Sequence, residues 1–155
     1  MQKHESSAKS AKDIVTEWQQ GVERRDYQSV RGLLSDNISY VTPFNSFDRA
    51  EPYLKYLEHV NLPKFDIKKE FVDSNDVCIL HEYKFGTPPV TSLVCTWFHV
   101  DDDGKISSIR VILDPRPYPS AEDLLHTLQQ KIYSIPFSRN NRSGNEKYCY
   151  DERYE

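Results

Sequence analysis

The apolar residues of this chain change their spacing once along the sequence, and this change limits the fold more than any other feature. Near the start, Ile14, Trp18 and Val22 recur at helical intervals and form one apolar stripe. From Phe65 to Leu113 the spacing falls to two residues, which is the period of a β-strand. Helices followed by a run of strands predict an α+β domain, in which helices cover one face of a curved antiparallel sheet.

Capping signals divide the first half into two further helices and a strand. Asp26 can cap a short helix, and Asp48 with Glu51 three residues later resembles a capping box that opens a third helix. Between them, residues 36–44 (DNISYVTPF) alternate like a strand, which Pro43 ends because it lacks a backbone donor. The apolar faces of these two helices are Val30, Leu33 and Leu34, and then Tyr53, Leu54, Leu57 and Val60.

Four strands are predicted in the second half. They are KFDIKKEFV (64–72), DVCILHEYKF (76–85), TSLVCTWFHV (91–100) and KISSIRVIL (105–113). The first alternates Phe65, Ile67 and Phe71 against charged residues, with Lys69 interrupting the apolar set. Asp103-Gly104 is a hairpin signal between the last two strands, so the four strands form an antiparallel meander.

The two ends of the chain are more polar than its centre. Residues 1–10 are predicted to be flexible, and residues 136–155 are predicted to be a polar, disordered tail. Prolines after Leu113 end the sheet, and Ser120 can cap a last helix with apolar residues between 124 and 132. We therefore expect one domain that spans residues 11–135.

Charge and cysteine content exclude several classes of function. A net charge of −4 and a pI near 5.7 argue against a nucleic-acid-binding or anionic-membrane surface. No segment approaches membrane-spanning length, and the first residues lack the apolar core of an export signal. The three cysteines have no CxxC spacing, which indicates reduced thiols. We expect a cytoplasmic protein with no nucleic-acid or membrane partner.

No motif predicts a metal or a cofactor. The DDDG stretch at 101–104 lacks the alternating ligands and the distal glutamate of a calcium loop. His81-Glu82 lacks the second histidine of a zinc-binding HExxH motif, and there is no Gly-rich phosphate-binding loop. We expect the protein to function without a metal or a cofactor.

Two groups of residues, in their order and spacing, resemble a known family. They are Trp18, Arg25-Asp26, Leu33-Leu34, Asp36, Ile38, Tyr40 and Pro43-Phe44, followed by Phe98, the stretch FHVDDDGKI, Val111 and Asp114. Over roughly residues 13–116 the chain resembles the nuclear transport factor 2-like superfamily, in its ketosteroid isomerase and SnoaL-like polyketide cyclase branch. The resemblance implies a cone-shaped curved sheet wrapped around helices, with an apolar cavity at its open end.

The resemblance also implies which side chains face the cavity. By analogy with ketosteroid isomerase, the ligand-binding set is Trp18, Tyr40, Thr42, Phe44, Leu57, Ile79, Thr96, Phe98 and Val111. The outer face of the last strands then carries Leu93, Cys95, Trp97 and Ile112, and it is too apolar for the solvated surface of a monomer. We expect a homodimer through this face and a small hydrophobic or aromatic molecule in the cavity.

The catalytic groups of the related enzymes do not carry over to this chain. Thr42 and Thr96 hold the positions of the two carboxylates of ketosteroid isomerase, and Trp18 aligns with its tyrosine. A threonine cannot act as a base near neutral pH, and an indole N–H donates a hydrogen bond without giving up its proton. The carboxylate of the epoxide-hydrolase branch meets Val111.

His81 is the remaining inward-facing group that titrates near neutral pH. Desolvation on its apolar face favours the neutral imidazole. It could act as a general base that removes a carbon-bound proton or activates water, with Tyr83 or Tyr40 holding an oxygen. The alternative is a buried structural histidine satisfied by one tyrosine and one backbone carbonyl.

Asp114 is the second catalytic candidate. It matches a SnoaL-like aspartate at the end of the last strand, where a bulge could turn it inward. Simple alternation points it outward instead, where Asp114-Pro115 caps a turn and Arg116 or Arg110 is an ion-pair partner.

Two functions from different classes follow. The first is a small-molecule pocket protein, a cofactor-independent lyase, isomerase or cyclase that uses His81 as its base. The second is a non-catalytic dimeric binding or adaptor protein. An open cavity that exposes His81 favours the first, and a cavity filled by Trp18, Tyr40 and Phe98 favours the second.

Overall fold

The computed structural model describes residues 9–60, 62, 64–85 and 88–119. All of these except Pro119 belong to one compact unit, Met1–Tyr118, and a second unit comprises Pro119–Glu155. The predicted last helix and the predicted tail at 136–155 lie outside the described residues, as do the first eight residues. The domain limits 11–135 therefore stay a prediction.

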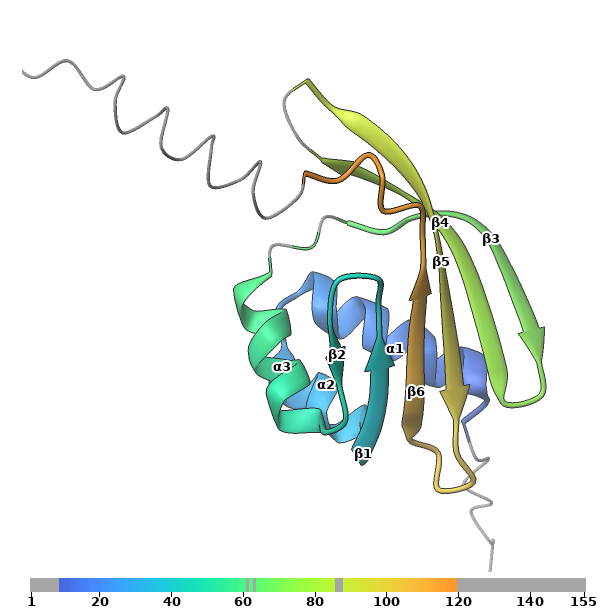
Figure 1. Ribbon diagram of the computed structural model, residues 1–155. Helices are drawn as coiled ribbons and strands as arrows, with labels where there is room; N and C mark the ends of the chain where they lie inside the picture. Colours follow the sequence, from blue (N-terminus) through green and yellow to red (C-terminus); the bar gives the residue numbers. More distant parts are fainter. Residues whose placement is uncertain (1–8, 61, 63, 86–87, 120–155) are drawn as a thin grey trace, which may run out of the picture. The chain divides into compact units, whose positions relative to one another are not determined.

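Three helices and six strands make up the described unit (Figure 1). In chain order they are α1 (Ala11–Glu23), α2 (Tyr27–Leu33), β1 (Leu34–Val41), β2 (Ser46–Phe47), α3 (Ala50–His59), β3 (Asp66–Asp73), β4 (Asp76–Phe85), β5 (Val90–Val100) and β6 (Ile106–Ile112). The strands form one curved sheet in the order β2-β1-β6-β5-β4-β3, and Figure 1 shows the helices on one side of it. The predicted α+β class is confirmed.

The sheet is antiparallel except for one pair of strands. The meander from β3 to β6 is antiparallel throughout, as predicted. β1 instead runs parallel to β6, with Tyr40 beside Ile109 and Val41 beside Arg110. Parallel neighbours need a long connection between them, and α3 with the first three strands of the meander supplies it.

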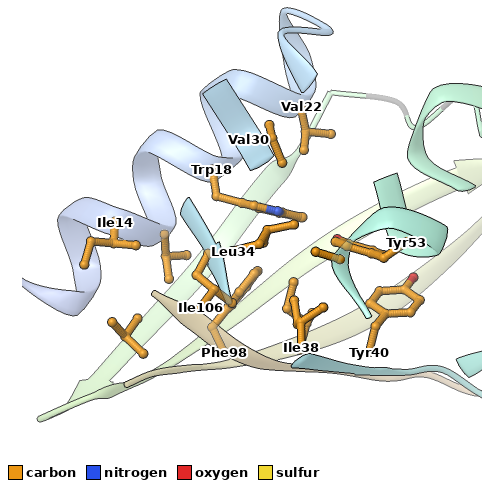
Figure 2. Packing of buried hydrophobic residues seen from close by; sticks show 14 of the residues in the cluster. Ile14, Trp18, Val22, Val30, Leu34, Ile38, Tyr40, Tyr53, Phe98 and Ile106 are labelled. Carbon is orange, nitrogen blue, oxygen red and sulfur yellow. The ribbon is translucent and has the colours of Figure 1, made fainter. Parts of the chain in front are cut away.

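The core lies between the inner face of the sheet and α1 (Figure 2). Trp18 of α1 packs edge-on against Phe98 of β5, with ring centroids 5.0 Å apart. Beneath α1, the side chains of Ile38 on β1 and Ile106 on β6 have no exposed surface. The predicted apolar stripe of α1 is confirmed, because Ile14, Val15, Trp18 and Val22 are all buried.

A side-chain cap is present at the start of α2 but not at the start of α3, so one of the two predicted caps is wrong. The Asp26 side chain accepts a hydrogen bond from the backbone N–H of Ser29 at 3.1 Å and caps α2, as predicted. α3 begins after Arg49 with no side-chain cap, so Asp48 and Glu51 do not form the predicted capping box. The Glu51 carboxylate instead accepts from Arg31 Nε at 2.7 Å, which draws it away from the helix start.

A β-bulge in β3 explains why Lys69 interrupts the apolar pattern. Ile67 pairs with His81 and Lys69 pairs with Leu80, so one extra residue lies between these two pairs. The extra residue reverses the faces of the following side chains, and the predicted single apolar face through Ile67 and Phe71 is wrong. Both side chains are about half exposed on this edge strand.

The turn between β5 and β6 is the hairpin that Asp103-Gly104 predicted. Gly104 adopts a φ of 70°, which favours glycine over residues with a side chain. Its backbone N–H donates to the Asp101 carbonyl at 3.0 Å. The turn fixes the register in which the last strand meets β5.

We predict opposite stability effects for alanine at two helical glycines. A Cβ at Gly21 in α1 would lie 2.7 Å from Cγ2 of Val30, whose side chain is fully buried, whereas a Cβ at Gly32 in α2 would meet nothing within 4 Å. Gly21→Ala should lower the free energy of unfolding by about 1–3 kcal/mol through overpacking. Gly32→Ala should raise it by up to about 1 kcal/mol. Urea unfolding of both variants checks this, and a Gly21→Ala protein as stable as the parent would contradict the packing of α1 on α2.

Candidate functional site

A cavity of about 250 Å³ lies between the helices and the inner face of the sheet. Side chains from α1, α3, β1, β4, β5 and β6 line it, and most of them are apolar or aromatic. Small-molecule sites combine such walls with a few polar groups, and they usually measure about 300–1,000 Å³. The smaller volume here fits a compact ligand of one or two rings.

Aromatic rings form one wall of the cavity. The ring of Tyr40 lies 4.5 Å from that of Tyr53 and 5.8 Å from that of Tyr56, measured between centroids. Burial, followed by the neighbouring Tyr56, raises the pKa of Tyr40 far above its ordinary value. Burial also raises the pKa of Tyr53, which has no exposed surface. Both phenols are therefore protonated and neutral at physiological pH.

His81 lies on the sheet side of the cavity, with 5% of its surface exposed. Its Nε2 lies 3.1 Å from Oγ1 of Thr96 on the neighbouring strand. Phe65 packs edge-on against the imidazole, with centroids 5.3 Å apart. Burial lowers the pKa of His81 below its ordinary value, so the ring is neutral at pH 7. A neutral imidazole can accept a proton at one nitrogen while the other holds its position by a hydrogen bond.

Two buried polar atoms in the cavity wall lack a hydrogen-bond partner. They are Nε1 of Trp18 and the hydroxyl oxygen of Tyr53, and they are the buried side-chain atoms without a partner in the described part of the chain. The two groups approach each other, because a side-chain hydrogen-bond interaction with Trp18 lowers the pKa of Tyr53 against the larger effect of burial, but the approach falls short of a well-formed hydrogen bond. Buried polar groups in folded proteins nearly always have a hydrogen-bond partner, so two buried atoms without one need an explanation.

The mouth of the cavity is shaped by the turn after β1. Oγ1 of Thr42 accepts from the backbone N–H groups of Phe44 and Asn45 at 3.1 and 3.0 Å, and it donates to Oδ1 of Asn45 at 2.9 Å. This turn presents Phe44, which is 55% exposed and packs against Tyr118 with ring centroids 5.1 Å apart. Thr42 is therefore the anchor of the turn at the pocket mouth.

Two charged residues, Lys64 and Glu82, belong to the described lining of the cavity. Lys64 is exposed, and Glu82 lies across the strands from the outward Leu93 and forms an ion pair with Lys68 at 3.4 Å. Asp114 does not belong to the lining and is bound by Arg116, whose hydrogen bonds lower the pKa of Asp114 to about 2. Its Oδ1 accepts from the backbone N–H of Arg116 at 3.1 Å, so the predicted turn cap with Arg116 as ion-pair partner is confirmed.

The SnoaL-like domain family model matches residues 15–109, which is more than half of the chain. The chain belongs to the SnoaL-like domain family. Its structure is similar to that of a nuclear transport factor 2-like protein of unknown function from Cytophaga hutchinsonii, with 23% identity and a TM-score of 0.64. That similarity covers 72% of this chain and 96% of the other. The resemblance inferred from the sequence is confirmed.

Two further structures have the same fold. One is an epoxide hydrolase from M. tuberculosis described as LEH-like, with 22% identity and a TM-score of 0.57 over 79% of this chain and 95% of the other. The second is a proposed SnoaL-like polyketide cyclase from Shewanella denitrificans, with 12% identity and a TM-score of 0.58 over 77% and 97%. At these identities the similarity establishes the fold alone. No match was found among curated proteins.

The structure brings most of the predicted site residues of this SnoaL-like domain together. Those that line the cavity are Trp18, Tyr40, Thr42, Phe44, Leu57, Thr96 and Val111, together with the catalytic candidates His81 and Tyr83. Ile79 and Phe98 are each 1% exposed and pack into the core outside the lining. Burial is the largest cause that raises the pKa of Tyr83.

Sequence reasoning missed several lining residues of the SnoaL-like domain. They include Tyr53, Tyr56, Phe65, Val94 and Tyr118. Tyr53 could have been found, because it lies one helical turn before Leu57 and therefore on the same face of α3. No periodic pattern predicts Tyr118, which follows the last strand in a turn closed by its N–H to the Pro115 carbonyl at 3.0 Å.

The outer face of the sheet is apolar, as predicted, and three of the four residues named for it are exposed. Leu93, Trp97 and Ile112 are 60%, 43% and 52% exposed. Nε1 of Trp97 donates to Asp76 at 2.8 Å, which holds the indole against the sheet. Among the described residues, no His, Cys, Asp and Glu side chains gather in a group that could bind a metal, and no helix is long and apolar enough to cross a membrane.

We predict that His81 makes the free energy of unfolding decrease as the pH falls below about 6.5. Its folded-state pKa lies below the ordinary value of 6.5, so the unfolded chain binds the proton first as the pH falls. This contribution to stability is complete above about pH 6.5 and is lost progressively below it. Urea unfolding on both sides of pH 6.5 checks the slope. His81→Gln should flatten it, and a slope in His81→Gln equal to that of the parent protein would contradict the burial of His81.

Proposed function

We propose that this SnoaL-like domain binds a compact hydrophobic or aromatic molecule and acts on it as a cofactor-independent lyase, isomerase or cyclase. The single observation that carries the proposal is a 250 Å³ cavity with the hydrogen-bonded pair of His81 and Thr96 in its wall. A void of this size would destabilise a purely structural core, which would fill it with side chains. Trp18 and Tyr40 line the cavity without filling it, which favours a ligand site over an adaptor.

His81 is the base in this proposal. Thr96 holds Nε2 of the ring at 3.1 Å, and no other hydrogen bond to His81 is found within the described residues, which leaves Nδ1 for the substrate. The ring removes a proton from a carbon beside a carbonyl, the electron pair moves onto the carbonyl oxygen, and a phenol such as Tyr83 donates a hydrogen bond to it. The proton then returns to another carbon or leaves with the product.

This reaction class can be tested before the natural substrate is known. 2-Indanone carries acidic protons beside its carbonyl and is small enough for the cavity. In D₂O, the protein should accelerate exchange of these protons for deuterium above the buffer rate, measured by ¹H NMR. Because a positioned general base contributes about 10²–10⁴-fold, His81→Gln should reduce the acceleration by about 100-fold.

His99→Gln is the matched control, since His99 lies on the opposite face of the sheet and pairs with Asp76 at 3.0 Å. It should exchange at the wild-type rate. Circular dichroism melting confirms that both variants fold. Equal exchange in the wild type and in folded His81→Gln would remove His81 as the base, and a buffer-level rate in the wild type would argue against this reaction class.

We also propose that two copies associate through the outer face of the sheet. Three large apolar side chains are exposed there on the adjacent strands β5 and β6, and Cys95 pairs across these strands with Ile112. Monomeric proteins rarely leave such a contiguous patch in water. A symmetric dimer buries the same patch of both subunits.

A charge within this patch should separate the subunits. Leu93→Glu is expected to give a monomer at micromolar concentration, because association would bury an unpaired carboxylate. Glu70→Gln is the control away from this patch, since Glu70 pairs with Ile79 of β4 on the inward face and contacts Lys12. Sedimentation velocity measures the subunit count, and a wild-type protein that sediments as a monomer would overturn the dimer.

A further inference from the structure

We propose that Phe65 is a positioning residue for His81, and that Glu23 at the end of α1 holds Phe65 in place. The inference rests on the proposed function, because His81 is the base there, and it adds two residues that keep the imidazole in its reactive orientation. It comes from the contacts that link the imidazole through Phe65 to α1.

One hydrogen bond does not fix the imidazole of His81. Its Nε2 lies 3.1 Å from Oγ1 of Thr96. The torsion that turns an imidazole about its Cβ–Cγ bond has no sharply preferred value, so a ring with a single hydrogen bond can still tilt. Tilting moves Nδ1, the atom that takes the proton from the substrate in the proposed reaction. A second contact is therefore needed to hold Nδ1 in place.

The ring of Phe65 supplies that second contact. Its centroid lies 5.3 Å from that of the His81 imidazole, and the two ring planes meet at 74°, which is an edge-to-face arrangement that aromatic pairs prefer. Phe65 lines the cavity together with His81. A ring that meets the imidazole at this angle restricts its tilt, which the hydrogen bond to Thr96 alone does not.

Phe65 needs anchors of its own, because it precedes β3. The pairing of β3 with β4 begins at Asp66, one residue later. The backbone N–H of Phe65 donates instead to Oε1 of Glu23 at 3.2 Å, and the Phe65 ring packs against Trp18 with centroids 5.9 Å apart. Glu23 is the last residue of α1 and is exposed, so a residue at the protein surface holds the ring that packs on the base.

The Phe65 ring also keeps water away from His81. Burial is the cause that lowers the pKa of His81, and no other group contributes to the shift. Removal of the Phe65 ring should therefore raise this pKa toward the ordinary value of 6.5. The charged or titratable neighbours in the described lining are Lys64, Glu82, Tyr40, Tyr53, Tyr56, Tyr83 and Tyr118.

The pKa of His81 tests the proposal without a substrate. It is measured in the full chain by ¹H NMR titration of the imidazole C–H signals, and the His81 signals are identified by their absence from His81→Gln. Phe65→Ala should raise this pKa toward 6.5. Phe71→Ala is the matched control and should leave it unchanged, because Phe71 is 53% exposed, pairs with Cys78 and lies outside the cavity lining.

Two variants of Glu23 separate the position of Phe65 from the effect of charge. Glu23→Gln keeps an oxygen that can accept from the Phe65 N–H, and Glu23→Ala does not. Loss of a negative charge by itself lowers the pKa of a nearby imidazole, since the charge favours the imidazolium. A rise in the pKa of His81 in Glu23→Ala, without a rise in Glu23→Gln, therefore reports that Phe65 has lost its anchor.

The Glu23 variants also cover the case in which Phe65→Ala does not fold. Because Glu23 is exposed, both of its variants should keep the wild-type fold, which circular dichroism melting checks. The pKa comparison between Glu23→Ala and Glu23→Gln then decides the proposal without Phe65→Ala.

Exchange of the 2-indanone protons gives a second readout. At saturating 2-indanone, Glu23→Ala should exchange about tenfold more slowly than the wild type, because a misplaced catalytic group can cost up to about 100-fold. Glu23 does not line the cavity, so this loss does not come from a lost ligand contact. Glu23→Gln should recover most of the rate, and Phe71→Ala should exchange at the wild-type rate.

The outcomes separate this inference from the function on which it rests. If the wild type does not accelerate exchange, the proposed function fails, and the titration still decides whether Phe65 and Glu23 hold the imidazole of His81. If the pKa of His81 is the same in the wild type, folded Phe65→Ala and Glu23→Ala, the inference is overturned whatever the exchange rate. Wild-type exchange in Glu23→Ala would also overturn it, because the base would keep its position without the anchor.

Discussion

The packing of one indole, that of Trp18, sets the geometry on which the rest of the structure depends. Its ring meets Phe98 at 5.0 Å and Phe65 at 5.9 Å, so α1 is fixed both to β5 and to the segment that precedes β3. Aromatic contacts of this kind combine a large buried surface with a preferred ring orientation. The same ring forms part of the cavity wall, and its N–H is left without a partner there. The contact that holds the core together therefore also supplies a polar group to the site.

Thr42 and Thr96 have structural and supporting roles at the cavity. Thr42 organises the turn that presents Phe44 at the pocket mouth, through bonds to the backbone of residues 44 and 45. Thr96 positions the imidazole of His81. The chemistry of the cavity consequently depends on neutral donors and one neutral imidazole. Such a site suits a neutral substrate better than an ionic one.

Much of this arrangement follows from sequence periodicity, and the exceptions have identifiable physical causes. Two-residue alternation separated His81 and Thr96 from Leu93 and Trp97, because side chains on a regular strand alternate between faces, and the family resemblance indicated which of the two sets points inward. The alternation failed in β3, where a bulge reverses the faces of the side chains that follow it. The bulge arises from the pairing of β3 with β4, and the sequence of β3 alone does not reveal that pairing. The Asp48–Glu51 box failed because Arg31, twenty residues earlier, competes for the Glu51 carboxylate.

The site was less predictable than the fold for a similar reason. The helical stripe places Tyr53 and Leu57 on one face, and both line the cavity, but the stripe does not show which polar groups pair there. Whether a buried hydroxyl has a partner depends on side chains from several elements at once. The unpaired atoms of Trp18 and Tyr53 are therefore a property of the packed structure.

The most direct test of the central claim is to locate a bound probe by nuclear Overhauser effects to assigned side chains. With 2-indanone at saturating concentration, the account predicts contacts from the probe to the indole N–H of Trp18 and to the methyl groups of Thr96 and Val94, all of which line the cavity. Contacts only to the outward methyl groups of Leu93 and Ile112 would contradict it, because they would place the hydrophobic binding site on the opposite face of the sheet.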